Sequence, residues 1–216
     1  MAEWIDELFA DPEKEAEKAP EIEAPSIKIS HRMGHRQMAR KVRSEQALEA
    51  ELNWHFREGD CYHCFSLGDV DSLTYFKMVL RQQHINYAFI STWCMAGEDV
   101  EDLQRWFRRG MIDRVDFFVG EIFRGSYPDV YRLTKDFIEE ERDRIVVFRN
   151  HAKVMAIKGE RFDCLIESSA NVNTNPRSEN TVITVDKELT KTYINLFAGI
   201  QPFNRDDCGA DPYRVE

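Results

Sequence analysis

The chain has no run of eighteen apolar residues and no regular cysteine pattern, and each absence excludes a class of protein. Without a long apolar run, no membrane-spanning helix and no membrane partner are expected. The first residues are acidic and lack the basic and apolar regions of a signal peptide. The five cysteines are odd in number and irregularly spaced, which is typical of reduced thiols rather than of a disulfide framework. We therefore expect a cytoplasmic protein.

The cysteines do not indicate a metal site either. Cys61 and Cys64 flank His63, but structural zinc needs four ligands and the remaining cysteines are scattered along the chain. In a strand, His63 and Cys64 point to opposite faces. Buried free thiols are the better interpretation, so we expect neither a metal nor another cofactor.

The amino-terminal segment is strongly acidic, although the net charge of −10 says little about the fold. Residues 1–23 carry nine acidic residues and two lysines, interrupted by prolines, which predicts a disordered arm over residues 1–27. Trp4, Ile5, Leu8 and Phe9 form a small amphipathic patch within it. Such a patch fits a peptide that docks on a protein partner, and it equally fits a cluster that packs onto the domain.

The next segment is basic. Residues 24–44 contain no acidic residue, and Arg32, Arg36 and Arg40 recur at a spacing of four, which would place them on one helical face. We expect a basic and amphipathic helical segment over residues 28–58. Its arginines would contact the phosphates of a bound nucleic acid, or they would form a solvated face or pair with the acidic arm.

The remainder, residues 59–216, predicts an α/β domain. Short apolar runs at 61–67, 87–92, 114–119 and 145–148 alternate with helical patterns that begin near 73, 100 and 128. This alternation favours a mainly parallel sheet with helices on both faces. A hairpin, a strand over 181–185 and a helix over 187–197 complete the expected domain.

The residues that indicate a function lie in the stretch that follows the run at 145–148. His151 and Lys153 are two residues apart, so in a strand they would share one face. Small hydrogen-bonding side chains follow at Ser168, Ser169 and Asn171. An imidazole, an ammonium group, hydroxyls and an amide that converge from adjacent strands suit a bound phosphate.

This pattern, H-x-K then S-S-x-N and a later acidic residue at Glu179, resembles the signature of the phospholipase D superfamily. Ser168 stands where that signature usually has glycine, and Lys158 stands where it has aspartate. The gap between the two halves is about three residues longer than usual. In a hairpin longer than that of the usual motif, Asp163 would stand in the place of the missing aspartate.

The resemblance implies a mixed α/β fold and a metal-independent phosphodiesterase. His151 would attack phosphorus to give a phosphohistidine, while Lys153, Asn171 and Ser169 stabilise charge on the phosphate oxygens. Glu179 would orient a histidine, and Ser168 would contact the substrate. The family usually uses two copies of the motif. Because this chain contains only one His-x-Lys sequence, we expect a homodimer with one site built across its twofold axis.

Single-motif dimeric members of the family are often nucleases, and such a protein would fit a bacterium or a phage. We therefore expect nucleic acid, and DNA first, as substrate. The alternative is a catalytically silent phospholipase D-like module that binds nucleic acid or a protein, which Lys158 in the aspartate position favours.

Overall fold

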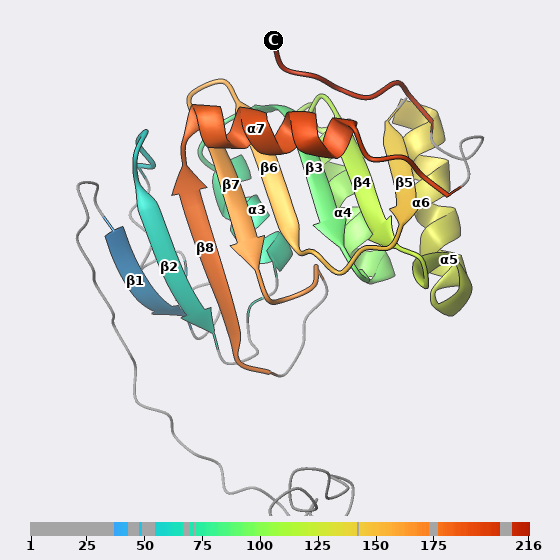
Figure 1. Ribbon diagram of the computed structural model, residues 1–216, viewed down its shortest axis with the longest axis horizontal. Helices are drawn as coiled ribbons and strands as arrows, with labels where there is room; N and C mark the ends of the chain where they lie inside the picture. The colour runs from blue at the N-terminus through green and yellow to red at the C-terminus, as the bar shows by residue number, and fades with distance from the viewer. Residues whose placement is uncertain are drawn as a thin grey trace, which may run out of the picture.

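The computed structural model describes residues 37–42, 48, 55–66, 70, 72–141, 143–172, 177–203 and 209–216. An eight-stranded sheet forms its centre (Figure 1). In order across the sheet the strands are β1 (Gln37–Val42), β2 (Cys61–Ser66), β8 (Glu179–Val185), β7 (Asp163–Ser168), β6 (Val154–Gly159), β3 (Ile85–Thr92), β4 (Val115–Gly120) and β5 (Arg144–Phe148).

The sheet is mixed. The pairs β1–β2, β3–β4 and β4–β5 are parallel, whereas β2–β8, β8–β7, β7–β6 and β6–β3 are antiparallel. All strands except β6 and β8 therefore run in one direction. The strands β6, β7 and β8 are consecutive in sequence and lie between β2 and β3, so they separate the parallel strands into two groups.

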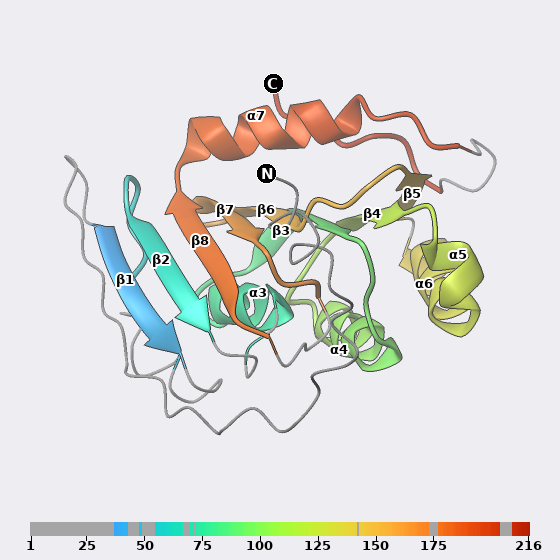
Figure 2. The same ribbon diagram turned by 60° about the horizontal axis from the view of Figure 1, so that its bottom comes forward.

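Helices cover both faces of the sheet, as expected from the sequence (Figure 2). Helix α7 (Lys187–Ala198) lies on one face, and α3 (Ser72–Leu80) and α4 (Gly97–Arg108) lie on the other. The short α5 (Phe123–Ser126) and the longer α6 (Pro128–Glu141) follow β4 and lead to β5. Among the described residues, no helix is long and apolar enough to cross a membrane.

Apolar side chains form one cluster on each side of the sheet. The larger cluster includes Phe76, Leu103 and Phe117, which are fully buried between the sheet and the helices α3, α4 and α6. The smaller cluster includes Phe89 and Phe197, whose rings stack at 4.2 Å beneath α7. Because β3 and β4 are covered on both faces, they are almost continuously buried, and their sequences are mainly apolar.

The basic segment differs from the sequence-based expectation. Residues 37–42 form strand β1, which pairs in parallel with β2, so the expected helical segment over residues 28–58 is wrong at these positions. The spacing of the arginines permitted a helix, but pairing with β2 satisfies the backbone of this segment, and basic residues are common on an edge strand. Arg40 lies in β1, whereas Arg32, Arg36 and the acidic arm lie outside the described residues.

The cysteines behave largely as expected. The four described cysteines are free: Cys64, Cys94 and Cys164 are buried, and Cys61 is half-buried. The Cys61 thiol lies 3.6 Å from the His63 imidazole on the exposed face of β2. Among the described residues, no group of three or more histidine, cysteine, aspartate or glutamate side chains is arranged to hold a metal ion.

Candidate active site

Most of the predicted site residues lie at one end of the central strands. The strands β3 and β7 end there, and β6 and β8 begin there, at the lower end of the sheet in Figure 1. His151 and Lys153 lie in the loop between β5 and β6, not in a strand as expected. Ser168 and Ser169 lie at the end of β7, and Glu179 is the first residue of β8.

Asn150 fixes the loop that carries the histidine. Its side chain is buried, and Nδ2 donates to Ser91 Oγ at 3.0 Å, to Phe118 O at 2.9 Å and to Thr92 O at 3.3 Å. Its Oδ1 accepts a hydrogen bond from the backbone N–H of Ala152 at 3.0 Å. The loop is therefore attached to the ends of both β3 and β4, directly before His151.

His151 and Lys153 converge although they are not in a strand. Lys153 Nζ lies 3.0 Å from His151 Nδ1 and 3.3 Å from Nε2, and it donates to the His151 carbonyl at 2.8 Å. Burial lowers the pKa of Lys153 from its ordinary value, and the nearby Cys94 and Glu179 oppose this shift. The partly buried ammonium group thus lies beside an exposed imidazole.

The two serines are held in different ways. Ser169 Oγ donates a short hydrogen bond to the buried Glu179 carboxylate and accepts from the Asn180 N–H at 2.9 Å. Ser168 Oγ lies 2.7 Å from Thr181 Oγ1 and accepts from the Ala170 N–H at 3.1 Å. Both hydroxyls are therefore positioned by strand β8 and by the turn that follows β7.

These side chains surround one open hollow of about 400 Å³. It is lined by His151, Ala152, Lys153, Val154, Glu167, Ser168 and Ser169. Glu167 accepts a hydrogen bond from Tyr193 OH at 2.9 Å, which turns its carboxylate toward α7. A cation, two hydroxyls and an imidazole around one hollow can bind a phosphoryl group and place a nucleophile beside it.

Some predicted residues lie elsewhere. Asn171 does not line the hollow, and its buried Oδ1 has no hydrogen-bond partner among the described residues. Its carbonyl oxygen accepts from Ser72 Oγ at 3.1 Å and therefore attaches the loop to α3. Arg40 lies in β1, which β2 and β8 separate from β7 in the sheet.

Lys158 and Asp163 also lie away from the hollow. They face each other across the β6–β7 hairpin with Nζ and Oδ2 at 3.4 Å, at the end opposite His151. Asp163 Oδ1 also accepts from the Gly159 N–H at 3.2 Å. Asp163 therefore stabilises the hairpin end and does not reach the catalytic candidates.

Cys94, which lies near Lys153, and Tyr127, which is hydrogen-bonded to Cys94, were not predicted. Burial raises the pKa of the Cys94 thiol, and a hydrogen bond with Tyr127 and the charge of Lys153 act in the opposite direction. The proximity of Cys94 in turn raises the pKa of Tyr127. Both groups therefore stay neutral near pH 7, and Cys94 adds no negative charge beside Lys153.

Trp93, which the sequence pattern did not single out, also lies at the site. It is half-buried after the end of β3, and its ring centroid is 5.4 Å from that of His151, with the planes at 52°. In contrast, Trp106 is buried and stacks on Phe76, as expected for a core residue. A tryptophan directly after a strand that ends at the site was the available sequence signal.

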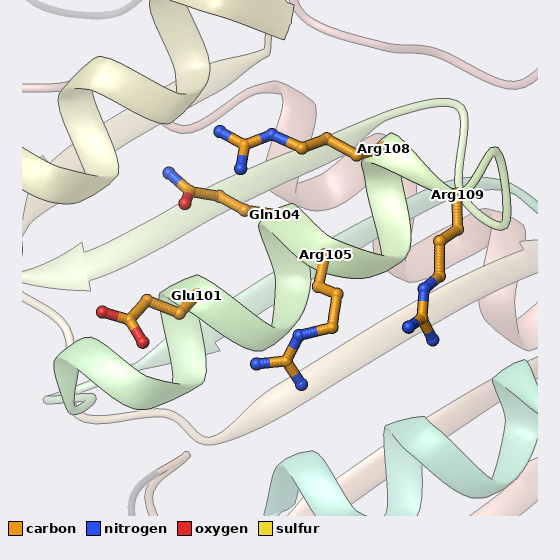
Figure 3. Close-up of a pocket in the computed structure, with 5 residues that line it drawn as sticks. All are labelled: Glu101, Gln104, Arg105, Arg108 and Arg109. Carbon is orange, nitrogen blue, oxygen red and sulfur yellow. The ribbon is translucent and has the colours of Figure 1, made fainter.

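A second hollow, of about 350 Å³, lies on α4 (Figure 3). It is lined by Glu101, Gln104, Arg105, Arg108 and Arg109. In Figure 3 Arg105 and Arg109 extend to one side of the helix and Arg108 to the other, so the guanidinium groups do not converge. Arg105 also pairs with Asp102 at 2.7 Å. Basic residues at a helix carboxyl end are favourable without any ligand.

The sequence has no match among protein-family models or among curated proteins. Among solved structures, the chain is similar to polyphosphate kinase from Porphyromonas gingivalis, with 17% identity and a TM-score of 0.49 over 63% of this chain and 25% of that one. It is also similar to phosphatidylserine synthase from Haemophilus influenzae, with 12% identity and a TM-score of 0.44 over 63% of this chain and 37% of that one. The chain thus spans 25% and 37% of the lengths of these two proteins.

Proposed function

We propose that this protein is a metal-independent phosphodiesterase, a nuclease that acts through a phosphohistidine intermediate at a site shared by two copies of the chain. The observation that carries the proposal is the convergence of His151 and Lys153 with Ser168 and Ser169 around one hollow. Glu179 accepts a hydrogen bond from Ser169 and thereby positions one of the hydroxyls that line the hollow. The similarity of these residues to the phospholipase D signature supports the same chemistry.

The reaction proceeds in two steps. An imidazole nitrogen of His151 forms a bond to phosphorus while the bond to the leaving oxygen breaks, and that oxygen takes a proton from a second histidine. Water then attacks the phosphohistidine, gives a proton back to the second histidine and releases a phosphomonoester. Lys153 and the serine hydroxyls stabilise the charge on the non-bridging oxygens in both steps.

The need for a second histidine favours a homodimer. The other described histidines are His55, His63 and His84. His84 pairs with Asp113 at 2.9 Å at the start of β3, which is the opposite end of the sheet. His63 lies within β2, and His55 precedes that strand. Within the described part of the chain none lies beside His151, so the partner's His151 is the proposed acid.

The dimer is tested by dilution. Sedimentation velocity and activity are measured over the same concentration range, and the turnover per chain is expected to fall as the dimer dissociates. Full turnover per chain in a strictly monomeric sample would contradict the shared site.

The activity is tested in EDTA with a chromogenic phosphodiester and with single- and double-stranded DNA and RNA. Wild type is compared with His151→Ala and with the control His63→Ala, which changes an exposed histidine outside the hollow. We expect turnover in wild type and in the control but none in His151→Ala, and a phosphoryl adduct on His151 after rapid quenching. Nucleic-acid binding without turnover in all three proteins would instead support the silent binding module.

A further inference from the structure

Trp93 is placed where it can contact the substrate. It lies beside His151 and is only partly buried. A tryptophan that served only the core would be enclosed as Trp106 is, at 6% exposure. The position of Trp93 next to the proposed nucleophile therefore calls for a role in binding.

The orientation of the Trp93 ring is fixed by its surroundings. A Cβ atom on Gly120 would lie 2.7 Å from Trp93 Cδ1 and 3.0 Å from Asn150 O, so the glycine leaves space for the ring against β4. On either side in sequence, Thr92 and Cys94 are buried, and Thr92 Oγ1 donates to the Cys94 carbonyl at 2.7 Å. The ring is therefore presented from rigid backbone, as a stacking surface requires.

The order of the strands places the serines and Trp93 on opposite sides of His151. At this end of the sheet, β7, β6 and β3 are neighbours, and strands lie about 4.8 Å apart. A phosphate held by Ser168 and Lys153 therefore has Trp93 about two strand spacings, or about 10 Å, away on the far side of His151. A group that is attached to such a phosphate and passes His151 would reach the indole ring.

Two arginines follow β5 and β4, which are parallel to β3 and end at the same end of the sheet. Arg149 is exposed in the loop that carries His151. Arg124 is exposed in α5, directly after β4, with its guanidinium 5.9 Å above the Tyr131 ring. Positive charge combined with an aromatic side chain is the usual means of binding the backbone and the bases of a single strand.

We propose that Trp93 stacks on an unpaired base next to the scissile phosphate, and that the substrate is therefore a single-stranded nucleic acid. This inference rests on the proposed function and narrows its substrate class. In a duplex the faces of each base are covered by its stacked neighbours, so only a single strand or a flipped base offers a free face to Trp93.

The test compares an oligothymidylate with an abasic sugar-phosphate oligomer of the same length and end label. Wild type is expected to show kcat/KM about 5- to 150-fold higher on the base-containing strand, the range that corresponds to stacking of one base. Trp93→Leu is expected to bring this ratio close to one, and Trp93→Phe is expected to retain part of it. The control Trp106→Phe changes a buried tryptophan on α4 and is expected to keep the wild-type ratio.

The ratio is diagnostic because any disturbance of His151 in the variants affects both substrates equally. A wild-type ratio in Trp93→Leu, or a ratio near one in wild type, would overturn the inference while leaving the phosphodiesterase intact. If no protein cleaves either strand, the proposed function fails separately. Binding of the two labelled oligomers by His151→Asn in EDTA, measured by anisotropy, then tests Trp93 through the same ratio.

Discussion

Asn150 offers the strictest test of how the fold positions the site. It makes three hydrogen bonds of normal length, two donated by Nδ2 to Ser91 Oγ and Phe118 O and one accepted from the Ala152 N–H. At about 1 kcal/mol net for each bond, Asn150→Ala is expected to lower the free energy of unfolding by about 3 kcal/mol. Because the loop is then released, kcat is expected to fall by about 100-fold.

The assay is denaturant unfolding at constant m-value, together with turnover under conditions where the variant is folded. Asn195→Ala is the matched control, because Asn195 also donates to and accepts from one backbone residue, Val215, but on the α7 side of the sheet. The control is expected to lose less stability and to keep its turnover. A loss below 1 kcal/mol in Asn150→Ala, or wild-type turnover, would refute the role of Asn150.

Asn150→Asp adds a test by pH. Its carboxylate would be buried opposite the oxygens of Ser91, Thr92 and Phe118, so its pKa would lie above the usual value of about 3.9. The electrostatic penalty is absent well below about pH 3.9, where the group is protonated in both states, and it grows as pH rises toward the folded-state pKa. We expect at least about 1.4 kcal/mol more destabilisation at pH 8 than at pH 4, whereas the penalty of Asn150→Ala stays constant.

Three further outcomes follow from the structure. Burial lowers the pKa of Lys153, so the midpoint of the alkaline decline in kcat/KM is expected to lie below pH 10.5. If the positive charge of Lys153 is required, Lys153→Arg is expected to move this midpoint to higher pH. A Cβ at Gly159 would overlap the side-chain amide of Gln83, which holds the hairpin end through hydrogen bonds to the backbone of residues 161 and 162. Gly159→Ala is therefore expected to lower the free energy of unfolding in urea by about 1–3 kcal/mol. Lys158→Met removes a partly exposed pair with Asp163 and is expected to change stability by less than about 1 kcal/mol and to leave kcat within twofold; a large loss of turnover would contradict the placement of this pair outside the site.

The strands were largely predictable because their signals are local. The apolar runs at 87–92 and 114–119 correspond to β3 and β4, which are buried on both faces. The order of the strands was not predictable, because it depends on pairs that are distant in sequence. Cys61, for example, pairs with Thr184, and no local pattern indicates that β8 lies beside β2.

The site was predictable to the extent that it is written as a motif. His151, Lys153, Ser168 and Ser169 follow each other at recognisable distances and do converge around the hollow. The role of Asn150 depends on hydrogen-bond acceptors in β3 and β4, which are distant in sequence. The residues next to Asn150 in the sequence therefore do not indicate this role. Trp93 likewise becomes a site residue only because β3 lies next to β6.

The choice between an active enzyme and a silent module depends on whether Lys158, in place of aspartate, reaches the reacting groups. Lys158 lies five residues after Lys153 and near the far end of β6, where it pairs with Asp163 in the adjacent position of β7. At about 3.3 Å per residue the separation along the strand is about 16 Å, and any charge effect over that distance is largely screened by salt. The pair also brings its own compensation, because the Asp163 carboxylate balances the ammonium of Lys158 and accepts from the Gly159 N–H at 3.2 Å. A lysine that is neutralised within the hairpin changes neither the charge at Lys153 nor the position of His151. The lysine at position 158 therefore affects how the hairpin end is held. It gives no physical reason to expect a catalytically silent protein.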